Sequence, residues 1–314
     1  MLSHNLPFRT PTLLVGCGYL GKQVAAALAR QSPEHVVYAT TRSQANAANL
    51  LKHSVVPMIA DWTDRRTLAR LPECGRVLIA VSYDRHSRQS REESQVGGLS
   101  HLLDFLPPQA DICYISTTGV YHQSDGSWVD ENSPARPRGE GGQVHLRAEQ
   151  LLSRRRPNCP WTVLRLAGIY GPGRVPRVAD VLARRPIEGA TAGYLNLIHV
   201  DDAAQAVLAT WTAEHRRRLY VVADDQPVVR RRFYEKVAEL AHAAAPNFTS
   251  PTAGTSAAFL SARSESNKRI WNRRFRRDLM PRLTYRNYID GLSALELATA
   301  SSQRQGVVAR YNPT

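Results

Sequence analysis

The sequence predicts an α/β fold in which a doubly wound parallel sheet carries a smaller C-terminal substrate lobe. Two observations lead to this prediction. Short apolar runs alternate with longer segments of helical period over the first half of the 314-residue chain, which is typical of parallel sheets covered by helices on both faces. A glycine-rich turn also joins the first apolar run to the first helical segment, and sheets of this kind bind phosphate at that point.

Six apolar runs are predicted to be the core strands, because each is short and bounded by polar or turn residues. They are TLLVGC (12–17), HVVYAT (35–40), SVVPMIA (54–60), RVLIAV (76–81), DICYIS (111–116) and TVLRLA (162–167). Helices are expected between them, for example at 19–30 and 95–106. Six strands with helical crossovers predict a doubly wound, Rossmann-type sheet.

The character of the sequence changes after Ala167 and predicts how the chain is divided. GIYGPGR is a turn-rich loop, NLIHVDDAAQAVLATW returns to a strand and a helix, and RLYVVADDQPV supplies another short strand. We therefore expect a Rossmann domain from residues 1–166 and 196–222. Residues 167–195 and 223–300 would form the substrate-binding lobe over the carboxyl ends of the strands, and residues 301–314 a loose tail.

The N-terminal segment and the cysteines bear on the class of protein. The first ten residues lack the features of a signal peptide, and no apolar run approaches membrane-spanning length. We therefore expect a cytoplasmic protein that does not bind membranes. Cys17, Cys74, Cys113 and Cys159 lie far apart and form no C-x-x-C pair, so buried thiols are expected rather than disulfides or a metal site.

The formal net charge of +14 points to an anionic partner. Much of the excess lies in NKRIWNRRFRRDLMPR (267–282). A solvated helix face is the simplest interpretation of such a cluster, a phosphate-binding role is the second, and nucleic-acid binding has the least support.

The glycine-rich turn predicts a dinucleotide-binding site. Gly16, Gly18 and Gly21 form G-x-G-x-x-G directly after a strand and at the start of an alanine-rich helix. The first glycine permits the tight turn, the second lets a pyrophosphate approach the backbone, and the third lets helix and strand pack closely. Tyr19 and Leu20 open the helix whose N-terminus would stabilise the anion, so we assign them to the cofactor site as well.

The end of the second strand favours NADP over NAD. Thr41 and Arg42 stand where an acidic side chain would contact the ribose of NAD, and an arginine there can pair with a 2′-phosphate. The alternative is that Arg42 is simply exposed. Asp61, just past the third strand, is placed to contact the adenine, although Asp61 or Thr63 could equally cap the following helix.

With these elements in order, the chain resembles the extended short-chain dehydrogenase/reductase superfamily, which includes nucleotide-sugar epimerases and dehydratases. The resemblance spans nearly the whole chain. It is carried by the glycine loop and by YISTTGVYHQSDGSWVDENSP, LRLAGIYGPGR and NLIHVDDAAQAV. It implies that Thr117, four residues before Tyr121, orients a substrate hydroxyl or carbonyl, and that the loop with Tyr170 passes the nicotinamide. A homodimer formed by two long helices is a further expectation from the resemblance.

Thr117 also has a purely structural interpretation, in which its hydroxyl satisfies the polar end of its own strand. The resembling enzymes use a tyrosine as acid/base in a Y-x-x-x-K motif, whose lysine lies four residues before a helix glutamate. Counting back from Glu149 places His145 and Gly141 at these two positions. The chain is therefore most similar to the atypical, NAD-dependent epimerase/dehydratase-like members, which keep the fold and the cofactor loop but lack this pair.

Thr117, His145 and Tyr83 are the candidate catalytic residues that remain. His145 lies on the helix that would carry the lysine, and an imidazole ordinarily titrates near neutrality; packing or solvent exposure is its other interpretation. Tyr83 follows the fourth strand and, like Tyr121, is either an acid or a wall of the pocket.

Two functions follow from these residues. The first is an NADP-binding oxidoreductase or epimerase-like enzyme acting on a sugar nucleotide or another anionic substrate, with Arg165, Arg174 or the late arginines meeting its charge. The second is a protein that binds NADP without turning it over, as a sensor or regulatory partner.

Overall fold

A computed structural model describes residues 10–188, 191–214, 217–249, 266–295 and 297. The predicted tail at 301–314 lies outside these residues. Within them, no helix is long and apolar enough to cross a membrane. Cys17, Cys74 and Cys113 are buried and Cys159 is partly buried, all as free thiols, and burial raises the pKa of the Cys17 thiol to about 11.

A seven-stranded sheet forms the centre of the molecule, with the order β12-β7-β5-β4-β1-β2-β3 and parallel pairing throughout. The strands are β1 (Thr12–Val15), β2 (Val37–Thr41), β3 (Val56–Ile59), β4 (Arg76–Ile79), β5 (Asp111–Thr117), β7 (Trp161–Leu166) and β12 (Leu219–Val222). The doubly wound sheet is therefore confirmed. All six predicted core strands are present, and the short strand predicted in RLYVVADDQPV adds the seventh.

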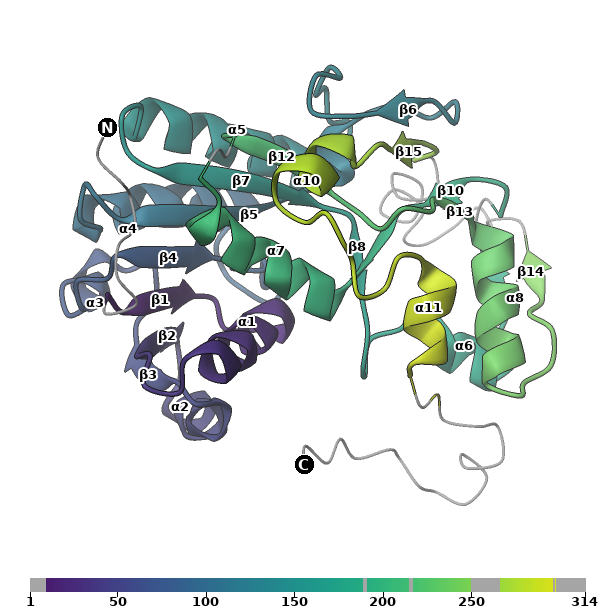
Figure 1. Cartoon of the computed structure of the whole chain (residues 1–314), viewed down its shortest axis with the longest axis horizontal. Coiled ribbons are helices and arrows are strands. Elements are labelled where there is room, and N and C mark those ends of the chain that lie inside the picture. The colour runs from purple at the N-terminus through teal and green to yellow at the C-terminus, as the bar shows by residue number, and fades with distance from the viewer. Residues whose placement is uncertain (1–9, 189–190, 215–216, 250–265, 296, 298–314) are drawn as a thin grey trace.

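Helices cover both faces of the sheet (Figure 1). They are α1 (Tyr19–Gln31), α2 (Gln44–Leu50), α3 (Arg65–Leu68), α4 (Gly98–Phe105), α5 (Glu140–Arg155) and α7 (Val200–Thr212), with a short 3-10 turn η1 (Leu51–His53) after α2. Because side chains alternate along a strand, Leu14 packs in the cluster under α1 and α7. Its neighbours Leu13 and Val15 pack in the opposite cluster with α4 and α5.

The helix expected at 95–106 has two parts. It begins as a π-helical turn, η2 (Glu93–Gly97), and continues as α4. A methyl group on Gly98 would lie 2.7 Å from the Trp62 ring, so the close approach of this helix to Trp62 requires glycine. π-Helical turns are frequent at functional sites, and η2 follows the loop after β4.

A second group of elements lies beside the carboxyl ends of the strands (Figure 1). It comprises β8 (Gly168–Tyr170), α6 (Val178–Leu182), β9 (Ile187–Glu188), β10 (Tyr194–Leu195), β11 (Leu197–His199), β13 (Val228–Val229), α8 (Arg230–Leu240), β14 (Phe248–Thr249) and α11 (Tyr288–Ser293). These elements share a hydrophobic cluster around Tyr170, Phe233 and Leu292. Leu197, which was expected in the Rossmann domain, also packs in it, and the domain boundaries stay a prediction.

The arginine-rich segment folds back onto the end of the sheet. Its strand β15 (Arg269–Ile270) pairs with β6 (Trp128–Val129), and α10 (Arg273–Asp278) follows. Its four crowded arginines all have partners: Arg274 pairs with Glu131, Arg276 with Asp225 and Arg277 with Asp278, while Arg273 stacks on Trp271. Neighbouring carboxylates therefore offset much of the charge of this segment.

Candidate functional site

The three glycines of the first turn have different structural roles. Gly16 has a φ of +89°, and a Cβ there would lie 2.7 Å from the Ala80 carbonyl oxygen. A Cβ on Gly21 would lie 2.9 Å from the Gly16 carbonyl oxygen. Gly18 precedes α1, and a Cβ there would meet nothing within 4 Å. Gly16 and Gly21 are thus required by packing, whereas Gly18 keeps the N-terminus of α1 open to a ligand.

The loop after β8 lies against this turn, although the two are 153 positions apart. The Tyr19 hydroxyl donates to the Pro172 carbonyl oxygen at 3.0 Å, and the Arg174 guanidinium lies 5.3 Å from the centre of the Tyr19 ring. Gly171, with a φ of +149°, leaves the room that the Tyr19 hydroxyl needs, since a Cβ would lie 2.8 Å from it. Tyr19 therefore joins the phosphate turn to this loop.

Two residues predicted to bind cofactor have buried side chains. Leu20 is buried in the core beneath α1. Tyr170 is 0% exposed, and its hydroxyl donates to the Asn287 carbonyl oxygen at 3.4 Å. Leu20 and Tyr170 can therefore contact a dinucleotide only through the backbone, and the predicted passage of this loop along the nicotinamide stays a prediction.

The end of β2 carries an ion pair that the sequence did not indicate. Arg42 is exposed, and its Nη2 donates to Asp84 Oδ2 at 2.8 Å. This hydrogen bond from Arg42 is the largest cause of the lowered pKa of Asp84. Thr41 is buried, and its Oγ1 accepts from Asn46 Nδ2. A carboxylate is thus present beside Arg42 after all, supplied by the loop after β4.

Asp61 closes a local turn. Its Oδ1 accepts from the Thr63 amide at 2.9 Å and from the Thr63 hydroxyl at 2.7 Å. The N-cap of α3 is Asp64, whose side chain accepts from the Arg66 amide. Neither Asp61 nor Thr63 is therefore the cap of this helix, and contact of Asp61 with adenine stays a prediction.

At the end of β5, Thr117 begins a 3-10 turn, η3 (Thr118–Val120). Its Oγ1 accepts from the Gly119 amide at 3.0 Å, as in the structural interpretation of this residue. Tyr121 is 3% exposed, and burial raises its pKa to about 12. Tyr121 is therefore a buried neutral phenol, whereas the partly exposed Thr117 hydroxyl can still reach a ligand at the strand end.

A buried network fixes α5 to the sheet. Glu149 Oε1 and Oε2 accept from Arg165 Nε and Nη2 at 3.0 and 2.6 Å, and the Ser116 hydroxyl donates to Glu149 Oε1 at 2.5 Å. Arg165 Nη1 also donates to the Tyr121 hydroxyl. Arg165 is 5% exposed, so its charge is compensated inside the protein, and Arg165 is not the group that meets an anionic substrate.

His145 faces β5. Its Nδ1 lies 3.2 Å from the Tyr114 hydroxyl. Burial, and to a smaller extent the positive charge of Arg91, lower the pKa of His145 to about 4. His145 is therefore held neutral at physiological pH, as in the packed interpretation of this residue, and a catalytic role for it stays a prediction.

Arg91 lies at the position where the tyrosine motif is missing. A Cβ on Gly141 would lie 3.6 Å from Arg91 Nη1. The guanidinium stacks on Tyr83, 4.4 Å from the ring centre, and its Nε lies 3.4 Å from Glu140 Oε2. The Tyr83 hydroxyl donates to the Gln89 carbonyl oxygen, and a catalytic role for Tyr83 stays a prediction. Sequence reasoning missed Arg91 because nothing local marks it.

The state of His145 can be measured directly. In NMR titrations, we expect the His145 ring to stay neutral near pH 6.5, where an ordinary histidine gains its proton. The pKa of His145 should be about 4. Because the folded state then binds fewer protons than the unfolded state, His145 makes the folded state less stable as the pH falls from 6.5 toward 4. Arg91→Met should raise this pKa, and a midpoint near 6.5 in the unaltered protein would contradict the burial.

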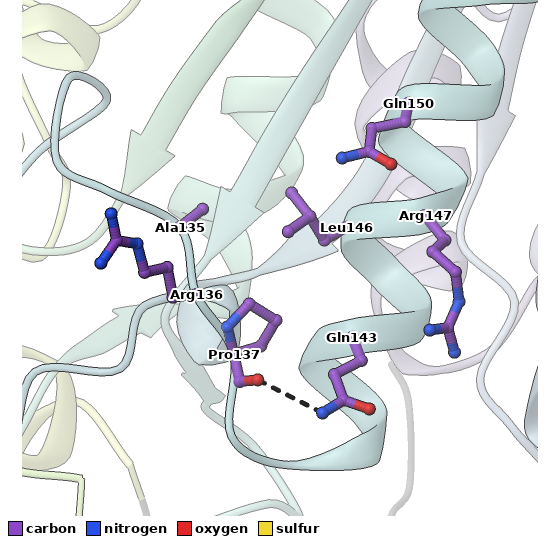
Figure 2. Close-up of a pocket in the computed structure, with 7 residues that line it drawn as sticks. All are labelled: Ala135, Arg136, Pro137, Gln143, Leu146, Arg147 and Gln150. Atoms are coloured by element: carbon purple, nitrogen blue, oxygen red, sulfur yellow. Dashed lines mark hydrogen bonds between the residues drawn. The ribbon is translucent and has the colours of Figure 1, made fainter.

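A groove of about 340 Å³ lies between α5 and the loop at residues 135–137 (Figure 2). It is lined by Ala135, Arg136, Pro137, Gln143, Leu146, Arg147 and Gln150. None of the predicted site residues lines it. His145 contacts β5 on the other side of the helix, so this groove is separate from the candidate site.

The sheet order and the open glycine turn define a dinucleotide-binding α/β protein. The chain belongs to the NAD dependent epimerase/dehydratase family, whose family model matches residues 12–223. The resemblance to the extended short-chain dehydrogenases is thereby confirmed.

The chain is also similar to individual known proteins. The chain is 26% identical to the protein YeeZ of Escherichia coli K12 over 250 residues, covering 75% of this chain and 85% of YeeZ. A conserved protein of unknown function from Silicibacter pomeroyi superposes with a TM-score of 0.73 at 28% identity, over 91% of this chain and 97% of that one. UDP-glucuronic acid 4-epimerase from Bacillus cereus, solved in complex with NAD, shares the fold at 17% identity, with a TM-score of 0.73 over 94% and 99% of the two chains.

Proposed function

We propose that this protein binds NADP(H) and is an oxidoreductase or epimerase-like enzyme acting on an anionic substrate such as a sugar nucleotide. The open N-terminus of α1 carries this proposal, because Gly18 leaves it unobstructed while Gly16 and Gly21 fix the turn around it. Backbone amides there would hold the pyrophosphate, and the Thr117 hydroxyl would orient the substrate. The bound cofactor would supply or accept the hydride.

Arg42 supports NADP over NAD. It extends from the end of β2, where the adenosine ribose lies in folds of this type, and it pairs with Asp84 from a neighbouring loop. A 2′-phosphate would offer Arg42 a bidentate partner of higher charge than this exposed carboxylate. Asp84 therefore competes with the phosphate without preventing its binding.

Calorimetric titration with NADPH and NADH tests the cofactor. Arg42→Ala should weaken NADPH binding about 10- to 100-fold, the worth of one charge-assisted hydrogen-bond partner, and leave NADH binding nearly unchanged. Asp84→Asn should tighten NADPH binding by freeing Arg42. Arg277→Ala removes another exposed, paired arginine and serves as the charge control. Equal losses in the Arg42 and Arg277 variants would rule out a specific 2′-phosphate site.

The second candidate function is NADP binding without turnover. Gly141 carries no proton donor, and His145 is neutral and held against Tyr114, which favours a site that keeps its cofactor but has lost its acid. The test is whether carbonyl compounds or sugar nucleotides oxidise NADPH bound to the protein. Tight NADPH binding with no oxidation across such a panel would favour the sensor.

A further inference from the structure

The side chain of Arg91 lies beside Gly141, the position at which the resembling enzymes carry their catalytic tyrosine. Its electrostatic environment is unusual. The side chain is 17% exposed, and Nε has a single long contact with Glu140, whose own side chain is 68% exposed. Among the residues that the structure describes, neither terminal nitrogen of Arg91 has a hydrogen-bond acceptor. Both terminal nitrogens reach the solvent and are therefore available to donate to a bound anion.

The neighbours of Arg91 place it at the ligand-binding edge of the sheet. Tyr83, on which it stacks, follows β4, and the same strand end supports the glycine turn through Ala80. Gly142, next to Gly141, packs directly on Gly119, since a Cβ there would lie within 2.3 Å of the Gly119 carbonyl oxygen. The guanidinium therefore lies at the carboxyl ends of β4 and β5, near the turn begun by Thr117.

Stacking on a phenol ring leaves the planar fork of a guanidinium free for a bidentate contact in its own plane. One partly neutralised positive charge balances the single charge of a carboxylate, whereas a phosphate dianion would keep an uncompensated charge beside Arg91. His145, kept neutral beside it, adds no second charge.

We propose that Arg91 binds a carboxylate of the substrate next to the reacting carbon, so that the substrate is a carbonyl or hydroxyl compound bearing a carboxylate. The reaction of this substrate rests on the proposed function, whereas the anion site at Arg91 does not. The guanidinium thus occupies the position of the missing acid and recognises the substrate instead of moving its proton.

Oxalate is the carboxylate probe, and inorganic phosphate is the anion with which it is compared. Sodium chloride keeps the ionic strength constant. Titrations followed by calorimetry and by arginine side-chain NMR are made with and without NADPH. Arg91→Met should weaken oxalate binding at least tenfold, and Arg91→Lys should weaken it less. Glu140→Gln should tighten it, because the competing carboxylate is removed. Arg88→Met changes an exposed arginine of the same loop and should have no effect.

Unchanged oxalate binding in Arg91→Met, or no oxalate binding by the unaltered protein, overturns the assignment even where NADPH binds normally. Phosphate binding as tightly as oxalate, and equally dependent on Arg91, overturns the carboxylate class. Oxalate binding that depends on Arg91 in a protein that fails to bind NADPH would support the anion site and refute the proposed function. Thermal melting of each variant separates lost binding from lost folding.

Discussion

Glu149→Ala is expected to lower the free energy of unfolding by about 3–5 kcal/mol, the cost of leaving one partner of a buried ion pair uncompensated. The side chains of Arg165 and Glu149 are only 6% and 9% exposed. The substitution would therefore leave the guanidinium without its carboxylate where little water reaches it, and would also remove the acceptor of the Ser116 hydroxyl. Urea unfolding followed by circular dichroism measures the change.

Glu92→Ala is the matched control, because Glu92 pairs with Arg147 at the surface, where both side chains are nearly half exposed. Exposed pairs contribute about 0–1 kcal/mol. Replacing both members of the buried pair, as in Glu149→Leu with Arg165→Met, should recover part of the loss. A loss for Glu149→Ala as small as that for Glu92→Ala would show that the buried pair does not hold α5 to the sheet.

Alanine at Gly18 should abolish NADP(H) binding and leave the fold intact, whereas alanine at Gly16 should damage the fold itself. A methyl group on Gly18 would meet no protein atom within 4 Å, but it would occupy the space through which a pyrophosphate approaches the backbone. A methyl group on Gly16 would lie 2.7 Å from a backbone oxygen, and the residue would be strained at a φ of +89°. That strain alone costs about 1–3 kcal/mol.

Calorimetric titration with NADPH and thermal melting of the two variants make this comparison. Each variant controls for the other, because both add one methyl group to the same turn. A Gly18→Ala protein that binds NADPH as tightly as the unaltered chain would mean that the turn serves the fold without holding a cofactor. A Gly16→Ala protein with an unchanged melting temperature would contradict the packing of this turn against β4.

The sheet could be predicted because its strands are marked locally. Each apolar run between polar segments became a strand, and the spacing of the glycines placed the first turn. The two-residue strands such as β6 and β15 carry no such mark, because their pairing depends on contacts between segments about 140 positions apart. The sequence also shows no sign that β11 would pair with β8 outside the main sheet.

The site was less predictable because its side chains interact with residues that are distant in the sequence. Arg42 was correctly placed at the end of β2, but its pairing with Asp84 depends on how two loops meet. Arg165 looked like a substrate contact until the packing of α5 supplied Glu149. The pKa of His145 followed from burial against β5 and from Arg91, which no spacing along the chain could have indicated.

The position of Arg91 bears on whether the tyrosine and lysine of the related enzymes could be introduced at Gly141 and His145. The Cβ of a tyrosine introduced at Gly141 would be in contact with the Arg91 guanidinium, 3.6 Å from Nη1, so the ring would have to lie beside that charge. A lysine restored at His145 would place a second cation beside it in a buried setting. Introducing the tyrosine and lysine of the related enzymes into this chain is therefore expected to need a change at Arg91 as well.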